Sequence, residues 1–229
     1  MTMGVVRDAS NGFNGGIPDN LGRLRRLCTL DLGYNAFSGE LSPNLTSCIH
    51  LTMLALHYNQ LHGRIPAALG LGGNLPRLKI LGLAKNNFTG TVPSSLANLS
   101  SLTTLSLGFN QLEGTLPSGL GGIAGLHSLD LAFNLFSGEL PRSLYNLSSL
   151  EVFQVQGNMF YGAIPADIGS RFPNMDTLNI AKNQFTGAIP ASLSNLTALQ
   201  VLQLQINRLS GYVPHSLGGR LQALQQLYL

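Results

Sequence analysis

Residues 102–117 read LTTLSLGFNQLEGTLP, and this arrangement recurs along nearly the whole chain of 229 residues. Leucines on alternate positions before Asn110 are typical of a short β-strand with one buried face. Gly114 favours a turn conformation that a side chain would resist. Pro117 has no N–H and suits an irregular segment better than a central strand. Each copy is therefore predicted to be a strand, a turn and a return segment.

The asparagine recurs mostly at intervals of 24 residues, with one interval of 27 and one of 25, and a glycine follows it four residues later each time. An asparagine amide can both donate to and accept from backbone groups that lose their partners where a strand ends. Stacked copies are expected to align these side chains into a ladder made of Asn11, Asn35, Asn59, Asn86, Asn110, Asn134, Asn158, Asn183 and Asn207.

The longer copies carry their extra residues on the return segment, between Leu69 and Leu75, Ile168 and Phe172, and Leu217 and Leu221. A slip of one residue in the strand would turn its leucines outward, whereas an outer loop lengthens at little entropic cost. The outer face is therefore predicted to tolerate insertion.

These columns predict one domain over residues 3–229, with nine repeats and a partial tenth. The first repeat is degenerate, because Asp8 stands where a buried leucine belongs. Terminal repeats of a solenoid usually carry a polar cap, and neither end has one, so we expect the chain to be a fragment. The predicted repeats are 3–26, 27–50, 51–77, 78–101, 102–125, 126–149, 150–174, 175–198, 199–223 and the partial repeat 224–229.

Charged residues make up only 10% of the chain, far below the usual ~25%, so uncharged polar groups must cover most of the surface. The 13 basic and 10 acidic residues are scattered, which argues against a nucleic-acid partner. The sequence contains neither a recognisable signal peptide nor an apolar stretch of ~18 residues. The two cysteines, Cys28 and Cys48, are too few for a disulfide framework and are predicted to be buried.

No catalytic residue, metal site or cofactor is predicted. Gly119 and Gly121 imitate a dinucleotide-binding loop, but they lie in a return segment without the strand-to-helix unit that such a loop needs. His57 and His62 have no carboxylate or cysteine cluster that would complete a metal site.

The unit L-x-x-L-x-L-x-x-N-x-[FL]-x-G-x-[ILV]-P resembles the leucine-rich repeat of plant receptor-like kinases and receptor-like proteins. This resemblance implies an α/β solenoid, a horseshoe or superhelix with a parallel sheet on its concave face and irregular and 3-10 helical segments on its convex face. LANLSSLTTLSLGFNQLEG (96–114) and IPASLSNLTALQVLQLQINRLSG (189–211) are similar to grass immune receptors that sense flagellin or elongation factor.

The resemblance implies a ligand-recognising ectodomain on the extracellular face of the plasma membrane, part of a glycoprotein that signals in plant defence. A peptide or protein ligand and a co-receptor ectodomain are the partners it implies, with the membrane reached only through a parent segment missing here. The parent would be a serine/threonine kinase. The chain itself has no VAIK, HRD or DFG sequence and is expected not to be an enzyme.

Ligand contacts are expected on the concave face, at strand positions that point away from the leucines. One column of these residues has an alternative interpretation, because Tyr34, Tyr58, Lys85, Phe109, Phe133 and Lys182 could instead pack against neighbouring repeats. The full set of candidates is Tyr34, His57, Tyr58, Lys85, Phe109, Phe133, Gln154, Gln156, Lys182, Gln203 and Gln205.

Peptide-hormone receptors of this family use an arginine pair that grips a ligand's terminal carboxylate. The corresponding positions here hold Gln154 with Gln156 and Gln203 with Gln205. A neutral amide cannot replace a guanidinium in that role, so a carboxylate clamp of this kind is not expected.

Five N-x-[ST] sequons are candidate glycosylation sites in a secreted parent, although the repeat consensus alone can also spell a sequon. They lie at Asn44, Asn87, Asn98, Asn146 and Asn195. Two other functions stay open. One is a secreted inhibitor resembling the polygalacturonase-inhibiting proteins, which carry cysteine caps at both ends, and the other is a truncated receptor product without independent activity.

Overall fold

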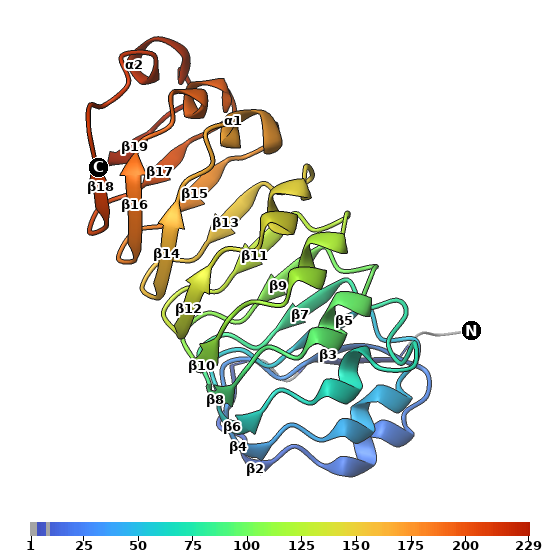
Figure 1. Cartoon of the computed structure of the whole chain (residues 1–229). Helices are drawn as coiled ribbons and strands as arrows, with labels where there is room; N and C mark the ends of the chain where they lie inside the picture. The colour runs from blue at the N-terminus through green and yellow to red at the C-terminus, as the bar shows by residue number, and fades with distance from the viewer. Residues whose placement is uncertain (1–3, 8–9) are drawn as a thin grey trace.

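In the computed structural model, which describes residues 4–7 and 10–229, the repeats stack in one column with the first strand of every repeat in a single parallel sheet (Figure 1). This confirms the predicted α/β solenoid. Consecutive odd-numbered strands are neighbours, so each repeat adds one strand to the edge of the sheet. The ten strands are β1 (Gly4–Arg7), β3 (Leu27–Asp31), β5 (Met53–Ala55), β7 (Ile80–Gly82), β9 (Thr104–Ser106), β11 (Ser128–Asp130), β13 (Val152–Gln154), β15 (Thr177–Asn179), β17 (Val201–Gln203) and β19 (Gln226–Tyr228).

A second parallel sheet of nine strands follows the ladder asparagines, where the sequence had predicted only a turn. Seven of them, from the second to the eighth, share a buried Phe or Leu two residues after the asparagine, such as Phe136, and a glycine at positive φ, such as Gly138. The strands are β2 (Asn14–Gly16), β4 (Ala36–Glu40), β6 (Gln60–Arg64), β8 (Asn87–Gly90), β10 (Gln111–Gly114), β12 (Leu135–Glu139), β14 (Met159–Ala163), β16 (Gln184–Ala188) and β18 (Arg208–Ser210).

The return segments begin after the proline that recurs in the repeats, and they form short helical turns on the side away from the ten-stranded sheet (Figure 1). Seven are 3-10 turns, in agreement with the expected outer face. They are η1 (Asp19–Arg23), η2 (Pro43–Ser47), η3 (Ala67–Gly70), η4 (Ser94–Asn98), η5 (Ser118–Gly122), η6 (Arg142–Asn146) and η7 (Ala191–Asn195). Two longer repeats have α-helical turns instead, α1 (Ile168–Arg171) and α2 (Leu217–Arg220).

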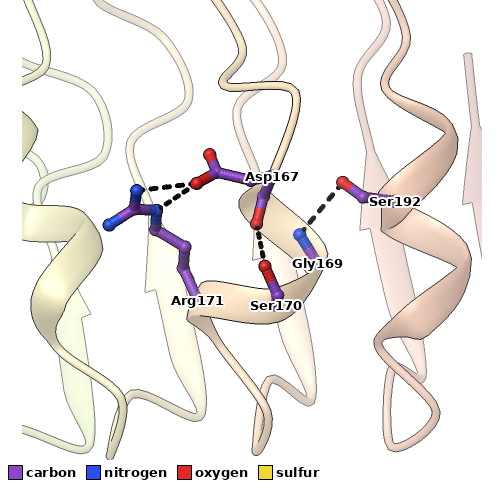
Figure 2. Close-up of polar contacts among 5 residues, drawn as sticks. All are labelled: Asp167, Gly169, Ser170, Arg171 and Ser192. Carbon is purple, nitrogen blue, oxygen red and sulfur yellow. Dashed lines mark hydrogen bonds and ion pairs between the residues drawn. The ribbon is translucent and has the colours of Figure 1, made fainter.

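The extra residue at α1 is accommodated locally, as Figure 2 shows. Arg171 Nε donates to Asp167 Oδ2 at 2.8 Å, and Arg171 Nη2 lies 2.6 Å from the same oxygen. Ser170 Oγ donates to the Asp167 carbonyl at 2.8 Å, and Gly169 N donates to Ser192 Oγ of the next repeat at 3.2 Å. Strands β13 and β15 on either side stay in register, so the insertion does not disturb the sheet.

The core lies between the two sheets and the helical turns. Leu102, Leu105 and Leu107 of the quoted repeat are fully buried. Burying one leucine side chain contributes roughly 1.5–3 kcal/mol, and nearly every repeat contributes several. Cys28 and Cys48 are buried as unpaired thiols, as predicted. Asp8, which replaces a core leucine in the first repeat, lies outside the described residues.

Each ladder asparagine in the middle of the array joins two repeats through its amide group. Asn134 Oδ1 accepts from Leu112 N of the preceding repeat at 3.0 Å, and Asn134 Nδ2 donates to Leu107 O at 3.1 Å. The same Nδ2 also lies 3.2 Å from Leu131 O and 3.3 Å from Ala132 O in its own repeat. Donor and acceptor are both needed, which explains why the position is asparagine rather than aspartate.

None of the described helices is long and apolar enough to cross a bilayer.

Candidate functional site

The open face of the ten-stranded sheet, called the strand face below, presents rows of side chains that run across the repeats. The strand pairing sets these rows, because Asp31 lies in register with Ala55, Ala55 with Gly82, Gly82 with Ser106 and Ser106 with Asp130. Neighbouring parallel strands are about 4.8 Å apart, so Asp31 and Asp130 are separated by roughly 19 Å. The eleven predicted ligand-contact residues all lie on this face or along its rim.

The rim of the strand face carries a ridge of stacked side chains, Tyr34, Tyr58, Lys85, Phe109 and Phe133. The rings of Tyr34 and Tyr58 stack with centroids 4.3 Å apart, and those of Phe109 and Phe133 with centroids 4.5 Å apart. Lys85 bridges the two pairs, since its Nζ lies 4.1 Å from the Tyr58 centroid and 5.0 Å from the Phe109 centroid and donates to the Tyr58 hydroxyl. The four aromatic residues stay 37–48% exposed.

The packing expected as the alternative for this column is present, while a role of these residues in ligand contact stays a prediction. The ridge residues pack against their neighbours in the next repeat, and each still presents a large surface to solvent. Stacked aromatic pairs contribute ~0.5–1.5 kcal/mol beyond their buried area, so the ridge is held in place before any ligand arrives.

The backbone of the ridge is unusual, because all five residues have φ between 52° and 56°. A bulky side chain in this left-handed region costs about 1–3 kcal/mol, and such strain gathers at functional sites. The seventh repeat has Gly157 at the equivalent position, with φ of 70°, so glycine is compatible with the fold there. A Cβ on Gly157 would lie 2.7 Å from the Phe133 ring, which covers that glycine.

A trough of about 440 Å³ lies beside the ridge. Its floor is made of small residues, because Ala55, Gly82 and Ala84 line it. The remaining lining residues are Asp31, Met53, His57, Tyr58, Ile80, Lys85, Thr104, Ser106, Phe109 and Asp130.

Two side chains of the trough cover glycines of the preceding repeat. A Cβ on Gly33 would lie 2.8 Å from the His57 ring, and a Cβ on Gly108 would lie 2.7 Å from the Asp130 carboxylate. Glycine at these positions therefore makes room for His57 and Asp130. The His57 ring also meets the Tyr34 ring edge-on, with centroids 5.0 Å apart.

Asp130 is the partly buried acid of the trough. Its Oδ2 accepts from Ser106 Oγ at 3.0 Å and its Oδ1 accepts from Ala132 N at 3.1 Å. Burial raises the pKa of Asp130 above its ordinary value, and these two hydrogen bonds only partly oppose that rise. A carboxylate in this position gains from a nearby cation.

The C-terminal half of the strand face carries amides instead of aromatic rings. Gln154, Gln156, Gln203 and Gln205 are all partly exposed there, and Asn179 Nδ2 donates to Gln203 Oε1 at 2.5 Å. The Oε1 atoms of Gln156 and Gln205 are buried without a hydrogen-bond partner among the described residues. Such a surface offers hydrogen bonds to the main chain of a ligand but no charge to a carboxylate.

Lys182 extends the ridge past Gly157, with its Nζ 5.7 Å from the Phe133 centroid. Not every outward position of the sheet is open, however. Ala132 is 1% and Ala181 2% exposed.

Sequence reasoning did not select Asp31, Asp130, Met53, Ile80 or Thr104 as ligand contacts, although each lines the trough. The available signal was the column itself, since Asp31 and Asp130 are acids among the otherwise uncharged residues of the sheet row from β3 to β17. No cluster of three potential metal ligands occurs in the described part of the chain.

The sequons lie away from the strand face. Asn44, Asn98, Asn146 and Asn195 are exposed on the helical turns, and Asn87 is exposed in β8 of the second sheet. Asn98 Nδ2 donates to Gly70 O at 3.0 Å, whereas Asn195 Oδ1 accepts from Arg220 at 3.1 Å.

Family models described as leucine rich repeat match residues 26–48, 76–136 and 174–196. No curated protein sequence gives a significant match.

Among solved structures, the Arabidopsis receptor kinase HAESA, in complex with the peptide hormone IDA and the co-receptor SERK1, is 36% identical with a TM-score of 0.88. The match covers 93% of this chain and 35% of that one. The plant peptide hormone receptor RGFR1, in complex with RGF2, is 30% identical with a TM-score of 0.88, covering 98% and 35%. The chain thus spans about a third of these receptor chains.

A plant ice-binding protein is also similar, with 26% identity and a TM-score of 0.85. The match covers 97% of this chain and 71% of that one. The same scaffold thus occurs in proteins with different partners, and function depends on the exposed side chains. The chain is a leucine-rich-repeat solenoid whose repeats are similar to those of plant receptor-kinase ectodomains.

Proposed function

We propose that the chain is a segment of the ligand-recognising ectodomain of a plant receptor-like kinase and binds a peptide or protein on its strand face. The observation that carries this proposal is the exposed ridge of Tyr34, Tyr58, Lys85, Phe109 and Phe133 beside an open trough. Rigid, partly exposed aromatic side chains are the usual anchors of protein interfaces. The similarity to receptors solved with peptide hormones supports the same role.

The setting we propose for this segment is the extracellular face of the plasma membrane. The parent would be a glycoprotein with a serine/threonine kinase domain, acting in signalling or defence, and would resemble the grass immune-receptor class. The segment itself would have no catalytic activity. A co-receptor ectodomain would complete the complex, as SERK1 does for HAESA. The exposed sequons leave the strand face clear, which is compatible with a glycosylated ectodomain.

The ligand's mode of binding would differ from a carboxylate clamp. Gln154, Gln156, Gln203 and Gln205 present neutral amides where an arginine pair would be needed. Amides pair well with both N–H and C=O groups of an extended main chain. We therefore propose that this half of the strand face binds the ligand's main chain rather than its terminus.

The full-length transcript is the first test of this proposal. An in-frame membrane helix followed by a kinase domain downstream of Leu229 would support a receptor. A stop codon preceded by a cysteine cap would instead favour a secreted inhibitor, and a stop directly after Leu229 would favour a truncated product. Secretion of the chain behind a plant signal peptide, followed by glycosidase treatment, tests the sequons, with a mobility shift as the expected result.

A further inference from the structure

The trough beside the ridge combines an acid, aromatic rings and an apolar wall. Phe109 and Asp130 line the same trough, and the Asp130 carboxylate covers Gly108, the residue directly before Phe109. Phe133 stacks on Phe109 from the next repeat. Met53 and Ile80 supply apolar side chains further along the trough.

The charges around the trough leave Asp130 without a cation. In the described part of the chain no basic group pairs with Asp130, and the one ion pair found there joins Asp167 and Arg171 on the outer face. Lys85 is the single ammonium group lining the trough, and it is already engaged by the Tyr58 hydroxyl and by two rings.

The opposite end of the trough differs. Asp31 lies in register with Arg7 of β1, whereas Asp130 has Ser106 and Gln154 as its register neighbours. Both are neutral.

We propose that the trough binds a lysine or arginine side chain of an extended peptide, with its cation at the Asp130 carboxylate. The inference rests on the proposed function, since it names the ligand chemistry of the same face. The Asp130 carboxylate would pair with the ligand's cation. Phe133 and Lys85 already cover the two faces of the Phe109 ring, so this ring offers its edge to the methylene groups of the ligand side chain. Ile80 and Met53 lie two and three strands away from Asp130, where they would contact another residue of the same peptide.

The dimensions of the trough suit an extended peptide. The row from Asp31 to Asp130 spans roughly 19 Å, and an extended chain advances about 3.3 Å per residue, so five or six ligand residues fit along it. The floor of Ala55, Gly82 and Ala84 lets a main chain approach the sheet closely.

The experiment uses a displayed library of random twelve-residue peptides, selected on the whole chain and counter-selected on Phe109→Gly. Glycine suits the positive φ at this position, so Phe109→Gly is expected to keep the fold, as Gly157 does in the seventh repeat. Ile206→Gly is the matched control, because Ile206 has φ of 59° in the same column but lies outside the trough. Selected peptides are then synthesised and their Kd values measured by calorimetry.

The expected result is a pool rich in lysine and arginine. Asp130→Asn should weaken a selected peptide at least tenfold, while Asp19→Asn, the same charge change on exposed η1, should leave its Kd within twofold. Replacing the peptide's basic residue by norleucine should weaken binding to the wild type and have no further effect on Asp130→Asn. This second change leaves the protein untouched, so it stays informative even if Asp130→Asn unfolds.

The outcomes separate the two proposals. A selected pool without basic residues would overturn the inference. So would basic peptides that bind Asp130→Asn as tightly as the wild type, together with norleucine variants that bind the wild type as tightly as the original peptides. Either outcome would leave peptide recognition standing. A wild-type chain that retains no peptide beyond the level of Phe109→Gly would overturn the proposed function as well.

Discussion

Replacing Asn134 by aspartate tests whether the asparagine ladder holds the repeats together. The change keeps the side chain's size and its acceptor for Leu112 N, but it removes both N–H donors of the amide. Those donors face Leu107 O at 3.1 Å and Leu131 O at 3.2 Å, with Ala132 O as a third, more distant acceptor at 3.3 Å. The aspartate would point a negative charge at these carbonyl oxygens.

The expected loss follows from those contacts. Asn134 is 7% exposed, so water cannot easily replace the missing donors. Leu107 O and Leu131 O each keep a donor, from Asn110 and Asn158, so the loss comes from burying a carboxylate oxygen that has no donor and faces these carbonyls. Asn134→Asp should therefore lower the free energy of unfolding by roughly 3–5 kcal/mol at pH 7.

The effect should depend on pH with a definite sign. The carbonyl oxygens and burial would raise the pKa of the new Asp carboxyl in the folded state above its unfolded value. The folded state is then least destabilised below the unfolded pKa, where the protonated acid can donate one hydrogen bond. The loss should grow as the pH rises through the raised folded pKa.

Urea unfolding, followed by circular dichroism because the chain has no tryptophan, measures this loss at pH 4 and pH 7. Asn207→Asp is the matched control near the end of the array. Asn207 donates to Ile180 O and Leu204 O but is partly exposed, so its loss should be at most half as large. An Asn134→Asp loss below about 1 kcal/mol, or one equal to that of Asn207→Asp, would refute the ladder argument.

Three further predictions follow from packing and burial. Gly169→Ala should lower the free energy of unfolding in urea by more than about 3 kcal/mol, because the new Cβ would lie 1.6 Å from the backbone oxygen of Ser192. At the equivalent position of α2, the new Cβ of Gly218→Ala would meet no other atom, so this change should be neutral or slightly stabilising. Burial raises the pKa of Asp130, so the wild type should lose stability relative to Asp130→Asn as the pH rises from the ordinary aspartate range through that raised value, and parallel stability curves for the two proteins would contradict this. Burial also raises the pKa of Tyr145 to about 12, so an absorbance titration should show one of the six tyrosines ionising late, and the wild type should lose roughly 3 kcal/mol relative to Tyr145→Phe between about pH 10 and pH 12.

The ten-stranded sheet was predictable because its leucine pattern recurs along nearly the whole sequence. The leucines of each strand alternate in the same way repeat after repeat, so the burial of Leu105 and Leu107 could be inferred before the structure was known. The second sheet gave no comparable signal. Most of its strands have a single core residue, such as Phe136, followed by a glycine that predicts a turn. Each of its strands pairs with the equivalent strand of the neighbouring repeats, and this pairing cannot be inferred from the sequence of one repeat.

The ridge was predictable as a column of residues but not as a structure. Sequence spacing places Tyr58, Lys85 and Phe109 in one row, yet it does not reveal that their backbone is left-handed or that Lys85 lies between two rings. Nor does it reveal that an outward position such as Ala132 is covered, with only 1% of its surface exposed. Local pattern determines the fold here, while the site depends on contacts between repeats.

Within each repeat, some residues hold the fold and others are free to vary. Ligand chemistry therefore has to be inferred from residues that differ from the repeat consensus rather than from the consensus itself. Leucines, ladder asparagines and turn glycines hold the solenoid, and a change among them is expected to alter stability in every member built on this scaffold. Residues between the leucines contribute little to that framework, so a protein can change them without losing its fold. The carboxylate of Asp130 lies over Gly108, where the described residues offer it no cation. This acid destabilises the fold because burial disfavours its charge. Its presence is therefore better explained by a ligand that supplies the missing cation than by the stability of the repeat.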